Sequence, residues 1–541
     1  MKKPGFWIGL GVGVVLTFPL IALFYLGYQI AGLPFTPFVP LEWFARTLPG
    51  SLVTFGVDAM VSVLRATGLG VADTAKLAEQ LISVFMILVL GGVAGGVYFF
   101  VRKRLPQAAN SVWPGVAVGG AIGLLLALMQ LSLPGGEGDD MMLTTIWTVS
   151  LYALWGLALG YSASRLTAPV PSPEATVQGV DRRHFLIQMG GAAAAITVTG
   201  AGIGALLSPR LPASEGAAVP AATLPPEQIA ALPNSSDPVR PAPGTRPEVT
   251  PVAQHYRIDI NMLPPVVAAE GYTLPFTSAI GGESATVKAY TLDELISGFT
   301  ATDAYITMSC ISNYVGGDLI GTTLWTGIPM QDILADTGIP DGATHLKMSA
   351  ADGFDETVAL DLIASDRRVM LCYAWEGQPL AVEHGFPLRI HIPNHFGMKQ
   401  PKWITGFEFL AGDQEGYWVR RGWDEQALVR STSVIDTVAV ESPMTSGDQT
   451  LIPIGGIAWA GDRGISKVEV QVDGGEWTEA QLRAPLSDRT WTIWRYDWPF
   501  SAGQHTFTVR TTDGDGVPQI ETAANPHPSG ATGYHSVSRA V

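Results

Sequence analysis

Long apolar stretches dominate the first third of the chain, and four of them are long enough to cross a bilayer as helices. A spanning helix needs about 20 mainly apolar residues. We therefore expect an α-helical membrane bundle over residues 1–166. A weaker stretch, Leu48–Leu64, contains Asp58 and is expected to lie at the membrane surface or half inserted. The four expected spans are Phe6–Ile30, Leu77–Val101, Val112–Leu133 and Met142–Ser162.

Positive charge around these spans is strongly one-sided. If the four spans alternate in direction, the cations that precede the first span and follow the second and fourth all fall on the same side of the membrane, whereas the loop 134–140 carries three acids and no cation. Because cytoplasmic loops are enriched in Lys and Arg, the N-terminus is predicted to be cytoplasmic. The flanking cations are Lys2, Lys3, Arg102, Lys103, Arg104 and Arg165.

Residues 167–208 form the next expected segment. Arg182 and Arg183 precede a Phe-Leu pair and then a Gly/Ala-rich apolar stretch that ends at Leu207. This order resembles a twin-arginine export signal placed inside the chain, and it equally fits a fifth span with positive flanks. Under both interpretations the arginines stay in the cytoplasm, and the chain after Leu207 lies in the periplasm or outside the cell.

The remaining chain changes character three times. Residues 209–250 are rich in Pro and Ala without periodicity, which predicts an extended tether. Residues 251–432 mix helix and strand patterns, so we expect an α+β domain there. Residues 433–541 alternate polar and apolar positions between Asp-Gly turns, which is typical of an all-β sandwich of immunoglobulin type. The fold class is thus multidomain: a membrane bundle, an α+β domain and an Ig-like sandwich.

Several short elements are predicted inside the α+β domain. The helix signals are a polar-apolar pattern before Gly298 and another that stops at Gly338, and the strand signals are short apolar runs. The expected helices are 292–298 and 325–337, and the expected buried strands are 369–375 and 387–392.

Composition excludes several classes of protein and site. The 541 residues are 47% hydrophobic and only 15% charged, and the net charge of -16 argues against nucleic acid as a partner. Two cysteines exclude a disulfide framework, a Cys-rich zinc site and a four-cysteine iron–sulfur cluster. There is no Cys-x-x-Cys-His, and no histidine precedes His184, so we expect neither haem nor an iron–sulfur cluster in this chain.

Cys310 is the first candidate for chemistry. It follows an apolar run, 304–308, and precedes Asn313 and a Gly-Gly pair. A thiol at a strand end beside small residues can reach a ligand, although a single cysteine also fits core packing. Cys372 lies within an apolar run and is interpreted as core packing. A disulfide between the two, which the sequence leaves open, would remove the site.

Three motifs follow one another in the second half of the chain. They are Cys310-Ile311-Ser312-Asn313 with Gly316-Gly317 and Trp325-x-Gly327, then Glu376 to Leu380 with His384 to Arg389, then Gly397 to Trp403. This order and spacing resemble the sulfite oxidase family of molybdopterin enzymes, and the resemblance covers about residues 251–541. It implies a catalytic molybdopterin domain at 251–432, and a dimerisation domain at 433–541 through which a homodimer could form.

The resemblance also implies a molybdenum–molybdopterin cofactor. In the family the cysteine of the first motif binds the metal, which assigns that role to Cys310 as a soft thiolate ligand. The pterin ends in a phosphate, and phosphates are held by cations and backbone N–H groups. Taken singly, the charged side chains also fit solvated surface positions. The cofactor contacts implied are Asn261, Asn313, His384, Arg389, Lys399, Gln400, Pro401 and Lys402.

One departure from the family concerns the substrate. Sulfite oxidases carry arginines just after the Cys-x-x-Asn motif, whereas Tyr314 and Val315 stand at those positions here. An oxyanion without that arginine loses charge-assisted hydrogen bonds, so sulfite fits less well. Arg257 or Arg463 could supply the missing charge from elsewhere in the chain.

The function expected is that of a membrane-anchored, extracytoplasmic molybdopterin oxidoreductase. By resemblance, it performs two-electron oxygen-atom transfer on a small oxyanion or sulfoxide-type substrate. A separate redox partner, a cytochrome or a quinone-linked protein, would exchange the electrons because the family's optional haem domain is lacking. Two alternatives stay open: a methionine sulfoxide reductase of the same fold, and a non-catalytic membrane-anchored binding protein.

Overall fold

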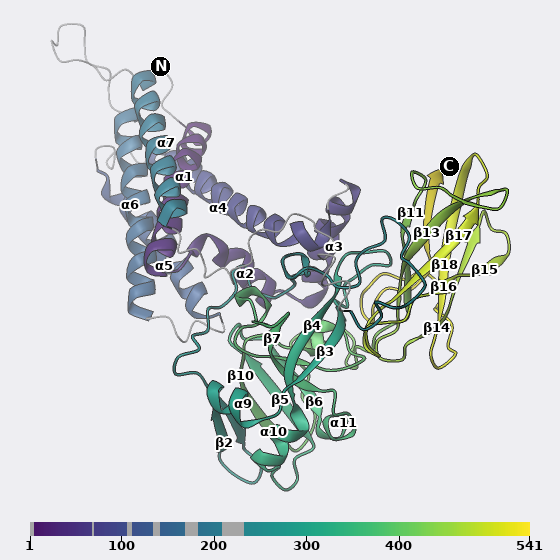
Figure 1. The fold of residues 1–541 in the computed structure, drawn as a ribbon. Helices are drawn as coiled ribbons and strands as arrows, with labels where there is room; N and C mark the ends of the chain where they lie inside the picture. Colours follow the sequence, from purple (N-terminus) through teal and green to yellow (C-terminus); the bar gives the residue numbers. More distant parts are fainter. Residues whose placement is uncertain (1–4, 68–69, 105–110, 134–140, 168–181, 208–231) are drawn as a thin grey trace, which may run out of the picture. The chain divides into compact units, whose positions relative to one another are not determined.

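The computed structural model describes residues 5–67, 70–104, 111–133, 141–167, 182–207 and 232–541 (Figure 1). The chain divides into two compact units, the first made of Met1–Leu48 and Lys76–Ala213 and the second of Pro49–Ala75 and Ser214–Val541. The acidic loop 134–140 and the first part of the expected tether, up to residue 231, lie outside the described residues.

The first unit is helical. Five of its described helices are long and apolar enough to cross a membrane, which agrees with the four expected spans and with a fifth over 182–207. The side of the membrane on which each end lies, and the twin-arginine signal, stay predictions. The helices are α1 (Phe6–Ala31), α2 (Val39–Thr47), α4 (Val71–Arg104), α5 (Trp113–Leu131), α6 (Met141–Thr167) and α7 (Arg182–Leu207).

Glycines allow the spans to approach closely. A Cβ atom added at Gly115 or Gly119 of α5 would collide with the backbone of α6, and one added at Gly13 of α1 would collide with the backbone of Gly91 in α4. Membrane helices associate through van der Waals packing, and small residues spaced four apart let two backbones meet. The helix pairing therefore depends on glycine spacing.

The weaker apolar stretch is also helical. It forms most of α3 (Gly50–Ala66), which belongs to the second unit by its contacts. Its expected position at the membrane surface stays a prediction.

The second unit contains two sheets over the α+β region. The first sheet has the order β2-β1-β10-β5-β6, and only the β1–β10 pair is parallel. Its strands are β1 (Thr273–Ser278), β2 (Ala285–Thr291), β5 (His345–Ala350), β6 (Asp355–Ala359) and β10 (Ile404–Leu410).

The second sheet carries the candidate cysteine. Its order is β3-β4-β7-β8, and β9 pairs with β7. Its strands are β3 (Thr302–Ser309), β4 (Ile320–Pro329), β7 (Met370–Trp375), β8 (Gln378–Pro379) and β9 (Arg389–His391). The expected strands at 369–375 and 387–392 correspond to β7 and β9.

Three short helices complete this region: α9 (Leu292–Gly298), α10 (Met330–Thr337) and α11 (Leu360–Ser365). The helix expected at 292–298 is confirmed, but the one expected at 325–337 begins only at Met330. Residues before it belong to β4, because Trp325 pairs with Ala304 on one side and Trp375 on the other. Pairing with two strands thus outweighs the local helix pattern. A core that includes Phe276, Met348 and Ile333 packs the first sheet against α10.

The C-terminal region is a two-sheet sandwich (yellow in Figure 1). One sheet has the order β11-β13-β17-β16, with β12 beside β13, and the other has the order β15-β14-β18-β19. Ile454 and Trp494 from the first sheet pack with Val468 and Phe507 from the second. The layout agrees with the expected β-rich domain, and its immunoglobulin type stays a prediction.

The sandwich strands have the following bounds. They are β11 (Thr432–Val438), β12 (Met444–Ser446), β13 (Gln449–Trp459), β14 (Ile465–Val472), β15 (Trp477–Glu479), β16 (Gln481–Leu482), β17 (Thr492–Pro499), β18 (Gln504–Asp513) and β19 (His535–Ala540).

The tether expected over 209–250 is wrong for residues 232–250, which pack against the sandwich. Arg483, with its side chain 3% exposed, donates from Nε to Glu248 Oε1 at 2.9 Å and from Nη1 to the carbonyl of Val239 at 2.9 Å. Ala484 N–H donates to Asp237 at 2.9 Å. Backbone carbonyls make much of this contact, so a Pro-rich composition without periodicity gives no sign of it.

Candidate active site

Cys310 lies one residue beyond β3, at the start of a closed loop. Its N–H donates to the carbonyl of Leu319 at 3.0 Å, and its own carbonyl accepts from Asn313 N–H at 3.0 Å. Asn313 Oδ1 accepts from Leu319 N–H at 3.0 Å. Gly316 has a φ of +77° within this loop, a conformation that favours glycine. Asn313 is therefore used to shape the loop that holds the cysteine.

Both cysteines are free, so the disulfide that would have removed the site does not form. Burial raises the pKa of the Cys310 thiol, and hydrogen bonds from Ser312 and the Ile311 backbone oppose the rise. The Ser312 hydroxyl lies 2.9 Å from the sulfur. Cys372 is fully buried in the core, as expected, and burial raises its pKa to about 12.

Arg389 is a buried cation on β9, opposite Cys372 in the neighbouring strand. It donates from Nη1 to the carbonyl of His384 at 3.1 Å, and its guanidinium lies 5.0 Å from the centre of the Trp325 ring. No carboxylate among the described residues pairs with it, and its Nε has no hydrogen-bond partner there. Burial lowers its pKa. An unpaired buried cation is costly unless an anion occupies the site.

Lys402 and Arg257 share a single acid beside this arginine. Asp259, with its side chain 1% exposed, accepts from Arg257 Nε at 2.7 Å and from Lys402 Nζ at 3.3 Å. Burial, together with nearby Arg389 and Arg257, lowers the pKa of Lys402 to about 8 although Asp259 opposes the shift. Arg257 Nη2 is buried and has no hydrogen-bond partner in the described part of the chain.

Two histidines lie within this positive field. The rings of His255 and His384 are 5.7 Å apart. Burial lowers the pKa of His255 to about 4, and nearby Arg389 contributes. Burial and then His255, Lys402 and Arg389 hold the pKa of His384 well below its usual value. Both imidazoles are therefore neutral near pH 7. His255 Nδ1 lies 3.4 Å from the carbonyl of Tyr256, which can only accept, so the single N–H of this neutral ring is used there. His384 can still donate to an anion.

Tyr256 connects the cysteine to the cationic cluster. Burial, and then the charge of a Cys310 thiolate, raises the pKa of this phenol, while Arg389 lowers it. Its hydroxyl also lies close to Gly397, where an added Cβ would be 3.1 Å away. The sulfur, the phenol and the guanidinium thus belong to one site on the face of the β3-β4-β7-β9 sheet.

The other predicted cofactor contacts form hydrogen bonds or ion pairs with residues of the chain itself. Lys399 Nζ donates to the buried carboxylate of Glu356 at 2.8 Å. Gln400 binds His391 Nδ1 at 3.0 Å and the carbonyl of His395 at 2.8 Å, and the carbonyl of Pro401 accepts from Ile390 N–H at 3.2 Å. Asn261 is buried, and its N–H donates to Asp259 at 3.2 Å. Lys399 thus already has an anionic partner, whereas Asn261 lies at the Asp259 end of the site.

The two arginines considered as substitutes for the missing oxyanion ligand lie in different places. Arg257 belongs to the site. Arg463 comes from the sandwich and is bound by Asp513 at 2.9 Å and by Asn394 at 2.6 Å. It therefore joins the two domains. Arg257 is the better placed of the two to meet an anion.

Sequence reasoning missed His255, Tyr256 and Asp259 as site residues. They lie close after the Pro-rich segment, more than fifty positions before Cys310, and only folding brings them beside His384 and Arg389. The one available signal was the run His-Tyr-Arg followed by an acid at the start of the domain, where no helix or strand pattern accounts for these residues.

Comparison with known proteins identifies the domain. The profile described as "Oxidoreductase molybdopterin binding domain" matches residues 263–418. The chain carries a molybdopterin-binding domain of the sulfite oxidase family. Mitochondrial sulfite oxidase of Homo sapiens is 27% identical over 296 residues, which are 46% of this chain and 53% of that protein. "Nitrate reductase [NAD(P)H]" of Hordeum vulgare is 26% identical over 310 residues, 47% of this chain and 34% of that protein.

This chain thus spans between a third and about half of the length of these molybdopterin-domain relatives. Among solved structures, the sulfane dehydrogenase SoxCD from Paracoccus pantotrophus is similar with a TM-score of 0.46 and 18% identity, over 60% of this chain and 92% of that chain.

The side chains of the candidate site have the chemistry that a molybdopterin cofactor requires. Two buried nitrogen atoms, Arg389 Nε and Arg257 Nη2, have no hydrogen-bond partner among the described residues. Buried polar groups are nearly always hydrogen-bonded. Donors without acceptors, in a region with more cations than acids, suit a phosphate-bearing ligand, and the free Cys310 supplies a soft donor for a metal.

Proposed function

We propose that this protein is a membrane-anchored, extracytoplasmic molybdopterin oxidoreductase that transfers an oxygen atom to or from a small substrate. The observation that carries the proposal is Arg389, a buried guanidinium with no carboxylate partner among the described residues. It lies in the sheet that contains β3, the strand that ends one residue before the free Cys310. A protein that merely kept the fold for binding elsewhere would have no need to bury such a charge.

The binding roles follow from the donors that lack partners. We assign the cofactor's phosphate to Arg389, with Lys402 as a further positive charge and His384 as a further donor beside it. Cys310 would bind the metal as a thiolate. When bound, the group supplies a two-electron redox centre. Asp259 holds Arg257 and Lys402 in place and keeps Lys402 partly charged despite its burial.

The substrate would be held by a donor near the sulfur. Cys310 and Arg389 both affect the pKa of the Tyr256 phenol, so we assign its hydroxyl as the donor to a substrate oxygen near the sulfur. Tyr314, at a position where sulfite oxidases carry arginine, offers no fixed positive charge. A neutral sulfoxide-type substrate therefore fits these donors better than a dianion, because the chain supplies a hydrogen bond there without a dedicated cation.

The membrane position and the partner complete the proposal. Four candidate spans precede α7, which is the fifth. If the N-terminus lies in the cytoplasm, α7 starts there and ends on the other side, and the second unit then lies outside the cytoplasm. Electrons would then come from, or pass to, a separate membrane-associated carrier. A homodimer through the C-terminal sandwich remains part of the proposal.

The test uses the full chain purified in detergent. We expect about one molybdenum atom and one pterin per chain, and reduction of a sulfoxide such as dimethyl sulfoxide to be faster than oxidation of sulfite. The Cys310→Ser variant should lose turnover. Protein with no molybdenum after expression in a host that makes the cofactor would contradict an enzyme and favour the binding-protein alternative. Faster sulfite oxidation would contradict the substrate assignment alone.

A further inference from the structure

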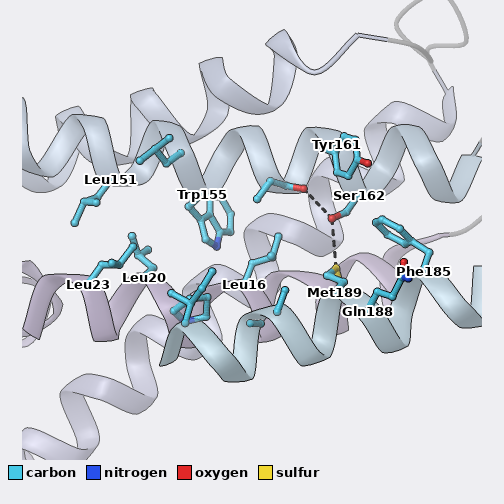
Figure 2. Close-up of a pocket in the computed structure, with 16 residues that line it drawn as sticks. Leu16, Leu20, Leu23, Leu151, Trp155, Tyr161, Ser162, Phe185, Gln188 and Met189 are labelled. Carbon is cyan, nitrogen blue, oxygen red and sulfur yellow. Dashed lines mark hydrogen bonds between the residues drawn. The ribbon is translucent and has the colours of Figure 1, made fainter. Parts of the chain in front are cut away.

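The membrane unit contains a cavity of about 460 Å³ between α1, α6 and α7 (Figure 2). Sites for small molecules commonly have volumes of about 300–1,000 Å³, apolar walls and a few polar groups. The walls here are mainly apolar, with Leu16, Leu20 and Leu23 along α1 and Ala193 on α7. The cavity is half open, since lining residues such as Leu154 and Ile196 are exposed. A half-open cavity of this size and character can hold one lipophilic molecule.

One polar group in the cavity wall lacks a partner. The Trp155 side chain is 5% exposed, and its buried Nε1 has no hydrogen-bond partner among the described residues. Figure 2 shows the indole nitrogen directed from α6 into the space toward α1. Ser162, by contrast, is already used: its hydroxyl donates to the carbonyl of Ala158 at 2.7 Å and lies 3.4 Å from the Met189 sulfur. A ligand with a hydrogen-bond acceptor would satisfy the indole.

The depth of Trp155 restricts the kind of acceptor. It stands in the middle of α6 (Met141–Thr167), about 21 Å from one end and about 18 Å from the other at 1.5 Å per residue. A phospholipid keeps its ester carbonyls near the membrane surface, so only acceptor-free acyl chain reaches this depth. A carbonyl at mid-membrane must belong to a molecule whose polar group is itself carried on a lipophilic body.

We propose that this cavity binds the ring of a lipophilic quinone, with a ring carbonyl accepting from Trp155 Nε1 and the tail lying along the leucines of α1. Binding stands independently of the proposed oxidoreductase function, because it can be measured without turnover. If that function also holds, the site gives the chain its own contact with the membrane's electron carriers.

The test measures binding of decylubiquinone to the full chain in phospholipid nanodiscs. Trp155→Phe keeps the ring and removes the donor, so affinity should fall about 3- to 10-fold, as expected for one hydrogen bond. Ala193→Phe, which fills the cavity, should lower affinity at least tenfold. Two matched controls should leave affinity unchanged: Trp147→Phe, whose ring packs on Phe24, and Ala194→Phe, which is exposed one position along α7.

Decylbenzene, which has the same tail length and no carbonyl, separates a quinone site from a lipid site. Quinone binding that is saturable, weakened by both cavity variants and not displaced by decylbenzene supports the proposal. Equal binding of the two probes, no effect of Trp155→Phe, or no saturable quinone binding would overturn it. Molybdenum content, measured on the same samples, reports on the catalytic domain separately, so failure of either proposal can be distinguished from failure of the other.

Discussion

Two buried arginines in the second unit are treated in opposite ways by their surroundings. Arg483, at the sandwich, has its side chain 3% exposed and is surrounded by Glu248, by Asn234 and by backbone carbonyls. Arg389, at the candidate site, is 6% exposed and has one backbone carbonyl, an aromatic ring and no described carboxylate. The two arginines are buried to a similar degree, but only the charge of Arg483 is compensated by a carboxylate among the described residues.

The difference separates structural arginines from functional ones. Taking a cation out of water costs several kcal/mol unless a partner offsets it. Arg483 has that partner within the chain, so it serves to fasten residues 232–250 to the sandwich. Arg389 has no such carboxylate in the described part of the chain, and under the proposed function its charge serves an anion that comes from outside the chain. The contrast leads to opposite expectations for the same substitution at the two positions.

The largest effect is expected for Arg483→Met. Removing the guanidinium leaves Glu248 and the amide of Asn234 buried with lost partners, which should lower the free energy of unfolding by about 3–5 kcal/mol. Urea denaturation, followed by tryptophan fluorescence, measures it. The control is Arg510→Met, whose partner Glu469 is paired at a half-exposed site; that change should stay within about 1 kcal/mol. Equal effects would show that Arg483 is not a fastening residue.

Cys310→Ser should abolish the proposed chemistry while leaving the fold intact. Loss of an outer partner of a metal ligand typically costs 10- to 100-fold in metal affinity or activity, so loss of the ligand itself should lower turnover by at least about 100-fold. The readouts are turnover and molybdenum per chain. Cys372→Ala, at the fully buried second cysteine, is the control and should keep the metal. A Cys310→Ser protein with normal metal and turnover would refute the assignment.

Arg389→Met should behave in the opposite sense to Arg483→Met. Because it removes an uncompensated charge, we expect cofactor-free protein to become more stable by about 1 kcal/mol or more, while the cofactor content after expression falls. Unfolding of the apoprotein and pterin analysis provide the two measurements. A destabilisation as large as that of Arg483→Met would mean that Arg389 has a structural partner after all, and the contrast between the two arginines would fail.

The sequence predicted much of this arrangement because its signals were local. Apolar length predicted four spans and left a fifth open, and five described helices are long and apolar enough to cross a membrane. Period-two alternation predicted the β-rich C-terminal region, which forms two sheets. The motifs around Cys310, His384 and Lys402 pointed to one site because a family shares them in that order. The packing of residues 232–250 was not predictable from composition. Residues 232–250 are fixed by carbonyls and by Arg483, which lies more than 230 positions away.

The sequence also could not predict which individual side chains of the site are available to a ligand. Lys399 and Lys402 are three positions apart and looked equivalent as phosphate ligands, yet Lys399 binds Glu356 while Lys402 turns to Asp259. Glu356 belongs to β6, whereas Asp259 lies in the segment before β1. No pattern along the chain therefore distinguishes the two lysines. Tertiary partners decide which cation remains available to a ligand.

Lys402 also gives the site a pH dependence. Burial and the neighbouring arginines lower the pKa of Lys402 to about 8, so the apoprotein loses this positive charge as the pH rises through that value. Binding of inorganic phosphate to the apoprotein should weaken above about pH 8, by up to about tenfold per pH unit for one proton. Titration calorimetry between pH 7 and 9.5 tests this. In Lys402→Met the slope should vanish; an unchanged slope would assign it to another group.

The smallest effect concerns the sulfur itself. Burial raises the pKa of Cys310 and the Ser312 hydrogen bond opposes that rise, so Ser312→Ala should raise the pKa further. Less thiolate is then present at pH 8, and alkylation of the apoprotein by iodoacetamide should slow about 3- to 10-fold, as one hydrogen bond allows. A Cys372→Ala background isolates Cys310.

Ser309→Ala is the matched control for this alkylation experiment, because the Ser309 hydroxyl donates to the carbonyls of Cys310 and Leu319 and not to the sulfur. It should leave the rate at pH 8 and the midpoint of the pH–rate curve unchanged. If both serine variants slow alkylation equally, the loop's shape controls the rate. In that case the thiolate is stabilised mainly by the backbone N–H groups of Ile311 and Ser312, and the site is prepared for a metal by the fold of the loop.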